Sequence, residues 1–249
     1  MEQIDKRKQD KLKFDRVINL AHRLPQPAIH DLLRALILPI QADYLLAVGT
    51  EGQDARPDMN EREFFFTKII WAMDYTHMKS LRLAAEDFPL ALATAKILPW
   101  PWGESSYRSA LADIGYTHMK SLRLAAEDFP LALATAKILP WPWGESSYRS
   151  ALADIGSAKG NPWVQDINHR VTLWLPWRIG FVRGGNHSIA SGVLAGEGEV
   201  IPDTVYDMRY LLDIVSTDGY YWYMSGKICE RVSDYRTAAF FEIGRLLTL

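Results

Sequence analysis

The residues best suited to do chemistry lie close together in the stretch VRGGNHS, residues 182–188. His187 has a side chain that titrates near neutral pH, so it is a candidate general acid or base. Asn186 is a candidate hydrogen-bonding residue that orients a ligand, and Arg183 is a candidate clamp for a phosphate group. These three residues are the predicted catalytic group.

The same stretch has the pattern of a turn that joins a strand to a helix. Hydrophobic residues precede it, and NHSIASGVLAG predicts a short helix after it. The N–H groups at a helix start attract anions, and two glycines let the backbone approach a ligand closely. The predicted phosphate-binding residues are Gly184, Gly185, Asn186 and Ser188. In the structural alternative, the glycines only make the turn, Asn186 caps the helix and His187 bonds to backbone.

Two further residues are predicted to assist at this turn. His169 precedes the first C-terminal strand and would join His187 if the two strands are neighbours; otherwise it is an ordinary buried or surface histidine. Arg178 is a second source of positive charge near the turn. No metal site is predicted, because paired His or Cys spacing is missing from the sequence. Cys229 has no histidine near it in the sequence and is predicted to be a structural thiol.

The turn and the residues after it resemble the ParB/sulfiredoxin-like superfamily. Its members place a D-G-x-H-R or G-N-H-R turn between a strand and a helix, followed by small residues, a glycine and a strand that opens with Val/Ile-Pro. The matching residues are Gly185, Asn186, His187, Ala190, Ser191, Gly196, Ile201 and Pro202, within residues 168–208. The resemblance implies that the turn binds nucleotide phosphates. Gly184 stands where Asp is usual and Ser188 where Arg is usual, so Arg183 or Arg178 would have to supply that arginine's charge.

A small mixed α/β domain, residues 157–249, is predicted to hold the turn. HRVTLWLPW and IGFV are rich in β-branched and aromatic residues and predict strands. VIPDTVYDM and YYWYM predict further strands, RYLLDIV predicts a helix, and residues 235–247 predict a closing helix. The aromatic strand would pack in a core or an interface, or stack against a base.

The N-terminal region, residues 1–74, is predicted to be all helical. Apolar residues at helical spacing predict helices over residues 5–24 and about 27–48, and Asn60 is the predicted N-cap of a third helix. The expected fold class is therefore α+β, with an all-helical N-terminal part followed by the small mixed α/β domain.

Between these regions, one 41-residue segment occurs twice without a single difference, at residues 75–115 and 116–156. Each copy is predicted to be helical except at its LPWPWG turn, where two prolines fix φ and remove N–H donors. Removing one copy from the 249 residues leaves a parent form of 208 residues. Two copies are too few for a solenoid, which needs at least three units.

Two identical copies have to compete for one docking site. The extra copy could pack as an added layer, loop out, or fill the equivalent site of another chain, which is domain swapping. Each copy carries two tryptophans whose exposure would leave an apolar patch, so we expect burial by layering or swapping. The alternative is an accidental or engineered duplication that the fold tolerates. A perfect coding repeat can also collapse to one copy by recombination, and a single copy can expand again. Proteins that are switched in this way are typically ones whose activity is costly, such as a toxin or a phage-defence effector.

The amino-acid composition limits the classes of protein to which this chain can belong. The chain is 48% hydrophobic and 23% charged with a net charge of −2, which is an ordinary globular composition without a strong general field for nucleic acid. One cysteine excludes an intramolecular disulfide and fits a reducing compartment. The start lacks the apolar core of a signal peptide, and no stretch approaches 18 apolar residues. These features predict a cytoplasmic protein without membrane contact.

Two functions of different class fit these patterns. The first is an intracellular bacterial effector, of anti-phage defence or a toxin system, whose C-terminal domain binds the phosphate of a nucleotide or nucleic acid. The residues leave open whether it is an enzyme; a nuclease or a nucleotide-processing enzyme would fit, with a nucleotide as the one suggested cofactor. The second is a non-enzymatic interaction protein that oligomerises through its duplicated segment. The expected partner in either case is another copy of the chain.

Overall fold

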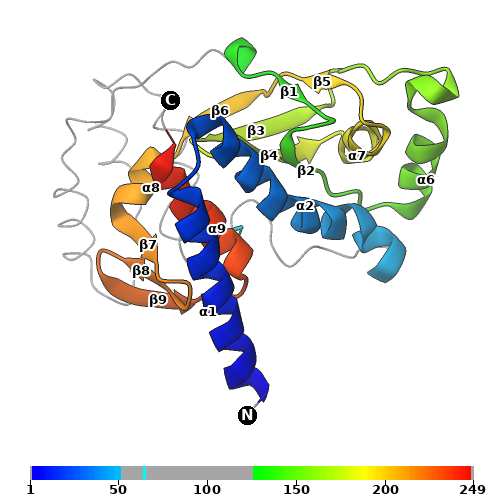
Figure 1. Ribbon diagram of the computed structural model, residues 1–249. Coiled ribbons are helices and arrows are strands. Elements are labelled where there is room, and N and C mark those ends of the chain that lie inside the picture. Colours follow the sequence, from blue (N-terminus) through cyan, green and yellow to red (C-terminus); the bar gives the residue numbers. More distant parts are fainter. Residues whose placement is uncertain (1, 52–63, 66–125, 248–249) are drawn as a thin grey trace, which may run out of the picture.

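The computed structural model describes residues 2–51, 64–65 and 126–247, and Figure 1 shows how their helices and strands are arranged. This part of the chain is mixed helix and strand, with two long helices first and the strands after them. The predicted order of helices before strands is therefore confirmed. The first repeat copy, residues 75–115, and the predicted N-cap Asn60 lie outside the described residues.

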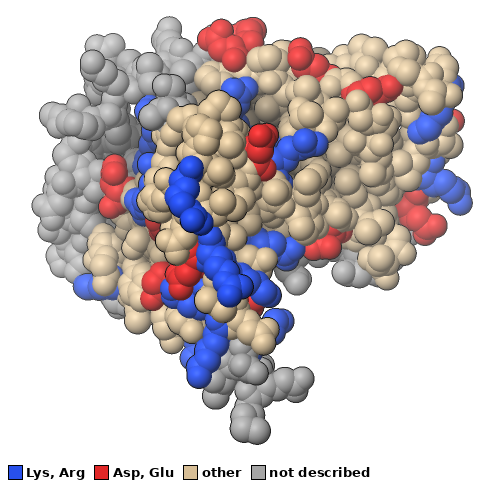
Figure 2. Space-filling model, in the orientation of Figure 1, with Lys and Arg blue, Asp and Glu red and all other residues tan. Residues whose placement is uncertain are grey.

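Two long helices open the chain, as predicted. α1 spans Glu2–Ala21 and α2 spans Gln26–Glu51. Figure 2 shows Lys and Arg side chains spread along α1 on the face that it draws. Carboxylates lie among them, as in the exposed ion pair between Lys13 and Asp10, with 3.1 Å between Nζ and Oδ1. Such i,i+3 pairs are typical of a solvated helix face.

A four-stranded sheet lies beside these helices, with the strand order β2-β4-β3-β6. The strands are β2 at Lys137–Leu139, β3 at Arg170–Leu175, β4 at Ile179–Gly184 and β6 at Thr204–Asp207. β3 and β4 pair antiparallel, whereas β2 runs parallel to β4 and β6 runs parallel to β3. Among the strands that the structure describes, β2 and β6 are therefore at the edges of this sheet.

Side chains of this sheet alternate between two hydrophobic cores, because successive residues of a strand point to opposite faces. Phe181 of β4 lies in the larger core, which α1, α2 and α9 cover. Leu173 of β3 lies in the smaller core, which α7 and the β1–β5 pair cover. The covering elements named here for the first time are α9 at Tyr235–Ile243, α7 at Asn186–Ala195, β1 at Leu131–Ala132 and β5 at Glu199–Val200.

Phe64 and Phe65 are fully part of the larger core, although they lie between two long segments outside the described residues. The ring of Phe64 meets that of Phe181 at 5.5 Å and 72°, and the ring of Phe65 meets that of Phe241 at 5.0 Å and 79°. Edge-to-face contacts of this kind add to the burial of aromatic area. They anchor residues 64–65 between the sheet and α9.

A second, smaller sheet closes the chain together with α8 and α9. It has the antiparallel order β7-β8-β9 and follows α8 at Arg209–Ile214. Its strands are β7 at Val215–Thr217, β8 at Tyr221–Met224 and β9 at Lys227–Arg231. The helices α8 and α9 and the strand β8 were predicted, whereas β7 and β9 were not.

The second repeat copy is not all helical, which corrects the sequence-based prediction. β1 and β2 lie where LALATAKI predicted a helix, while α6, at Glu145–Asp154, is helical as expected. Leu131 pairs with Val200, and Lys137 pairs with Ile179. These long-range pairings override the helix propensity of Leu and Ala. They also cross the predicted domain start at residue 157, so this copy supplies part of the central sheet.

α2 is, in the described part of the chain, the helix that is long and apolar enough to cross a membrane. An 18-residue window within Gln26–Thr50 has a mean hydropathy of 1.5, and half of that window is buried inside the protein. The helix packs against α9 and β2. Burial of this kind is also what a core helix shows, so the expected lack of membrane contact stays a prediction.

Candidate functional site

The GGNHS turn lies between β4 and α7, where the sequence predicted it (Figure 1). Gly185, not Asn186, is the N-cap of α7, and its φ of +72° is a left-handed conformation that favours glycine. The first N–H of α7 to reach an acceptor is that of Ile189, which donates to the Gly185 carbonyl at 2.9 Å. The N–H groups of residues 186–188 precede this ladder, as at any helix start.

The side chains of Asn186 and His187 hold the tryptophan turn of the second repeat copy. The backbone N–H of Trp141 donates to Oδ1 of Asn186 at 2.7 Å. The backbone N–H of Gly144 donates to Nε2 of His187 at 3.1 Å. We call this arrangement the WPWG clasp, in which Asn186 and His187 are the acceptors and residues 141–144 are the bound segment.

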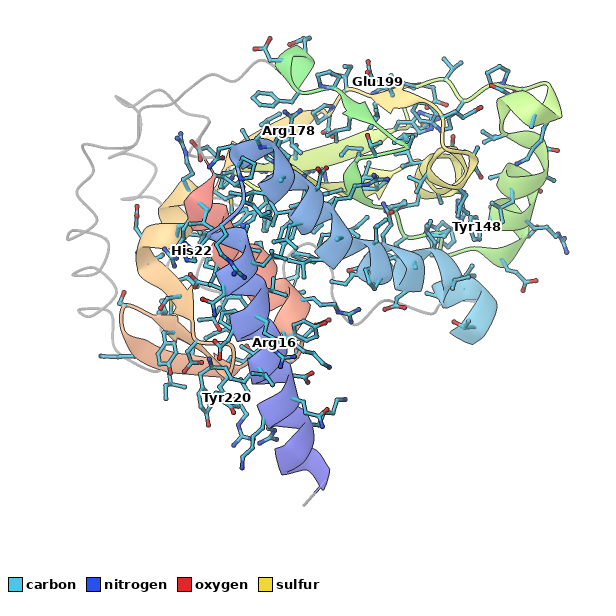
Figure 3. The ribbon with its side chains drawn as sticks, in the orientation of Figure 1. Arg16, His22, Tyr148, Arg178, Glu199 and Tyr220 are labelled. Atoms are coloured by element: carbon cyan, nitrogen blue, oxygen red, sulfur yellow. The ribbon has the colours of Figure 1, made fainter. Side chains whose placement is uncertain are left out.

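Packing between α6 and α7 supports the clasp. Tyr148 of α6 is buried with Ala190 of α7 in a small core that also takes in Leu45 and Val48 from the end of α2. Figure 3 shows Tyr148 beside α7, with its ring 6.4 Å from that of His187. The bound segment is thus held both by hydrogen bonds and by the helix that follows it.

Burial of the two tryptophans in the bound segment was expected and is only partly observed. Trp141 is partly buried and packs against the larger core. Trp143 remains 53% exposed, and its ring lies 5.5 Å from that of His187. An exposed tryptophan beside the clasp offers an apolar contact to a further molecule.

His187 is a neutral side chain in this arrangement. Its Nε2 accepts a hydrogen bond and therefore carries no proton, so the proton lies on Nδ1. Burial lowers the pKa of His187, which also favours the neutral form. The hydrogen bond to backbone is the structural alternative that the sequence left open. While the clasp is closed, Nδ1–H is the polar group of His187 that remains to meet a ligand.

His169 joins the turn by packing against it. A side chain at Gly185 would overlap the imidazole ring of His169, so the two residues are in close contact. Nδ1 of His169 accepts the backbone N–H of Asp166 at 2.7 Å, and the ring stacks on Trp163 at 4.8 Å. Burial lowers the pKa of His169, while the Asp166 carboxylate opposes this shift. His169 therefore supports the glycine turn as a buried, neutral side chain.

The two candidate arginines have different surroundings. Arg183 is exposed at the end of β4 and forms an ion pair with Asp203, with 2.6 Å between Nη2 and Oδ2. Arg178 precedes β4 at its other end, and six residues of strand put it about 20 Å from the turn. The structure therefore does not bring Arg178 to the GGNHS turn. Ser188 has its carbonyl bonded to the indole N–H of Trp163 at 2.9 Å, but no hydrogen bond of its hydroxyl is seen among the described residues.

Sequence reasoning missed Glu197, which ties the end of α7 to the end of the repeat. Its carboxylate accepts the backbone N–H groups of Ser157 and Trp163, both at 2.9 Å. Hydrogen bonds from Ser157, then from Trp163, lower the pKa of the Glu197 carboxyl. The position of this acid between two glycines after a helix was the available signal.

The described residues do not gather potential metal ligands, and the one cysteine is partly buried. Within residues 2–51, 64–65 and 126–247, no group of three His, Cys, Asp or Glu side chains could hold a metal ion. Cys229 lies partly buried in β9, and its thiol donates to the Lys227 carbonyl at 3.4 Å.

A protein-family model matches the chain over residues 1–125 and again over residues 123–249. The chain therefore belongs to DUF6710, a family of unknown function. The two matches indicate an internal duplication and meet within the second repeat copy. Comparisons with curated proteins and with solved structures find no match. The resemblance to the ParB/sulfiredoxin-like superfamily stays a prediction.

Proposed function

We propose that this chain is an interaction protein that assembles with further copies of itself through its duplicated segment. In this proposal the GGNHS turn is the receptor and the tryptophan turn of the repeat is the ligand segment. The observation that carries it is the WPWG clasp, in which Asn186 and His187 both accept backbone N–H groups of the repeat.

The chain carries two ligand segments for one receptor. The sequence WPWG occurs at residues 100–103 and again at residues 141–144, whereas GGNHS occurs once, at residues 184–188. Both hydrogen bonds of the clasp use backbone donors, which the first copy has in the same sequence context. Residues 100–103 are therefore equipped to enter the receptor of a second chain. Exchange of identical elements between chains is a low-cost route to oligomers.

Solution mass tests this proposal. The 249-residue protein should form dimers or larger species whose fraction rises with concentration, whereas the 208-residue form without residues 75–115 should stay monomeric. Sedimentation or light scattering measures both. The variant Asn186→Ala in the long form should weaken assembly, since it removes one acceptor of the clasp. Equal mass of the long and short forms at all concentrations would remove the proposal.

A second candidate is an intracellular bacterial effector, of anti-phage defence or a toxin system, that binds a nucleotide or nucleic-acid phosphate at the same turn. In its favour, the N–H groups of residues 186–188 lie at the start of α7, and the proton on Nδ1 of His187 is not used by the clasp. It predicts that His187→Ala abolishes the effect of expression on cell growth or phage resistance while mass and folding are unchanged. Trp100→Pro together with Trp141→Pro removes from both copies the backbone N–H that Asn186 accepts in the clasp. This pair should leave that effect intact in this candidate, but should prevent assembly in the first.

A further inference from the structure

A basic cluster lies at the end of the central sheet opposite the WPWG clasp. Its members come from three elements: His30 and Arg34 from α2, Lys137 from β2, and Arg178 from the turn before β4. Arg178 lies next to Ile179, the β4 partner of Lys137. Figure 3 shows Arg178 beside the start of α2, and Figure 2 shows basic side chains over this half of the helix.

Lys137 is the most unusual member, because it is a buried cation. Only 8% of the residue is exposed, on the face of β2 that also carries Leu139 toward α2. Over residues 2–51, 64–65 and 126–247, its ammonium group has neither a hydrogen bond nor an ion pair. The ammonium nitrogen itself keeps some contact with solvent, whereas most of the side chain is buried. A cation that is partly desolvated and has no protein partner favours a bound anion.

The other three members also keep donor capacity. Nδ1 of His30 is buried and has no hydrogen-bond partner in the described part of the chain. Arg34 donates from Nη2 to the carbonyl of Ala134 at 2.9 Å, and its other guanidinium N–H groups have no hydrogen bond within residues 2–51, 64–65 and 126–247. The guanidinium of Arg178 lies over the ring of Phe129, 5.7 Å from its centroid.

The charge at this cluster is strongly positive. Arg34 and Arg178 act on Lys137 as like charges, and Asp31 is the carboxylate whose charge opposes them. Burial, followed by the charges of Arg178 and Arg34, lowers the pKa of Lys137 to about 8. Burial, Lys137 and Arg178 in turn lower the pKa of His30. A bound anion would offset both effects.

We propose that His30, Arg34, Lys137 and Arg178 form a binding site for the phosphate group of a small phosphorylated molecule. Three permanent or near-permanent cations against one carboxylate suit a dianion, and guanidinium forks match phosphate oxygens. The site is separate from the WPWG clasp and does not depend on the proposed self-assembly. Because β2 belongs to the repeat, Lys96 is the residue of the first copy that matches Lys137.

Thermal unfolding of the full 249-residue protein, followed with added salts, tests this site. Sodium phosphate at pH 7 should raise the melting temperature in a saturable way, beyond the effect of sodium chloride at equal ionic strength. Calorimetric titration with phosphate and with AMP then gives the dissociation constants. If AMP binds at least tenfold more tightly than phosphate, the ligand is a phosphorylated nucleoside. If the two dissociation constants are equal, the ligand is the phosphate ion itself.

Substitutions separate the site from general salt effects. Lys137→Met should weaken phosphate binding at least tenfold, and Arg178→Gln should weaken it as well, which provides a second test should either variant fold poorly. The matched control is Lys8→Met, which removes an exposed lysine of α1 far from the cluster. General exclusion of phosphate from protein surfaces would stabilise all variants equally. An unchanged response in both site variants, or no saturable response in the wild type, would overturn the proposal.

Discussion

At the scale of single residues, the clasp uses two of the three side chains that the sequence assigned to catalysis. Asn186 and His187 were identified because amide and imidazole groups beside a glycine turn suit ligand binding. The structure shows that their acceptor atoms meet backbone N–H groups of the repeat. The turn was thus predictable from local sequence. The segment that it binds was not predictable, because residues 141–144 and 186–187 are distant in sequence and meet through the pairing of β2 with β4 and the packing of α6 on α7.

Gly185 is the residue on which the shape of the turn depends most. Gly185→Ala should destabilise the protein by about 2 kcal/mol or more, because alanine is strained at a φ of +72° and its Cβ would overlap the ring of His169. Gly226→Ala is the matched control, since Gly226 has a φ of +77° and open space around the position. It should cost only the backbone strain, about 1 kcal/mol. Urea unfolding at pH 7 measures both; equal losses would show that the contact with His169 does not matter.

Lys137 should make stability depend on alkaline pH. The folded state holds this proton with a pKa of about 8 against 10.5 when unfolded, so the unfolded chain binds more protons between these values. Stability of the wild type therefore gains from this lysine's deprotonation as pH rises from about 8 to 10.5. The charged and titratable groups around Lys137 are Arg34, Arg178, Asp31 and His30.

Lys137→Met removes that proton altogether. In buffer without phosphate the variant should be more stable than wild type at pH 7, by up to about 3 kcal/mol, and the difference should close between pH 8 and 10.5. Unfolding curves at four pH values measure it. A difference that is constant with pH would show that the lysine is not desolvated.

At the scale of elements, local pattern predicted most of what the structure contains. α1 and α2 follow from helical spacing of apolar residues, and β3 and β4 follow from β-branched and aromatic runs. The prediction was wrong in the second repeat copy, where LALATAKI forms strands instead of a helix. Leu131 and Leu133 are separated by alanine, and a stretch rich in Leu and Ala favours a helix in isolation. Its partners in β4 and β5 are distant in sequence and could not be read from the segment itself.

Strand β2 should contribute a large share of stability in a chain with a single copy. Ile138 is completely buried in the smaller core. In the 208-residue form, Ile138→Ala should cost about 3 kcal/mol, because it leaves a cavity under the sheet. Chemical unfolding measures the loss. A cost below about 1 kcal/mol would mean that this strand is not firmly packed.

At the scale of the whole molecule, the exact repeat allows two arrangements with the same contacts. In the structure, residues 126–156 of the second copy supply β1, β2 and α6. Residues 85–115 have the identical sequence, so they can supply the same elements, with the extra 41 residues placed after them instead of before them. The inserted segment has the same length in both cases, so loop entropy scarcely favours either arrangement.

A double-mutant comparison in the 249-residue protein detects the second arrangement. Ile97→Ala or Ile138→Ala alone should cost much less than the roughly 3 kcal/mol expected in the short form, because the unaltered copy takes over. Both substitutions together should restore the full cost. If Ile138→Ala alone already lowers the free energy of unfolding by the full amount and Ile97→Ala does not lower it, the first copy cannot replace the second and the exchange does not occur.

The position of β2 at the edge of the sheet has one more consequence. Because β2 has a single neighbouring strand within the described part of the chain, its release would break one short ladder of the central sheet and leave the β3–β4 pairing in place. Handing over from one copy to the other also requires the release of β1, α6 and the WPWG clasp, while β3, β4 and β6 can stay paired. Amide hydrogens of Lys137–Leu139 should consequently exchange with solvent well before those in the middle of β3. This order of exchange would show that β2 opens while β3 stays paired.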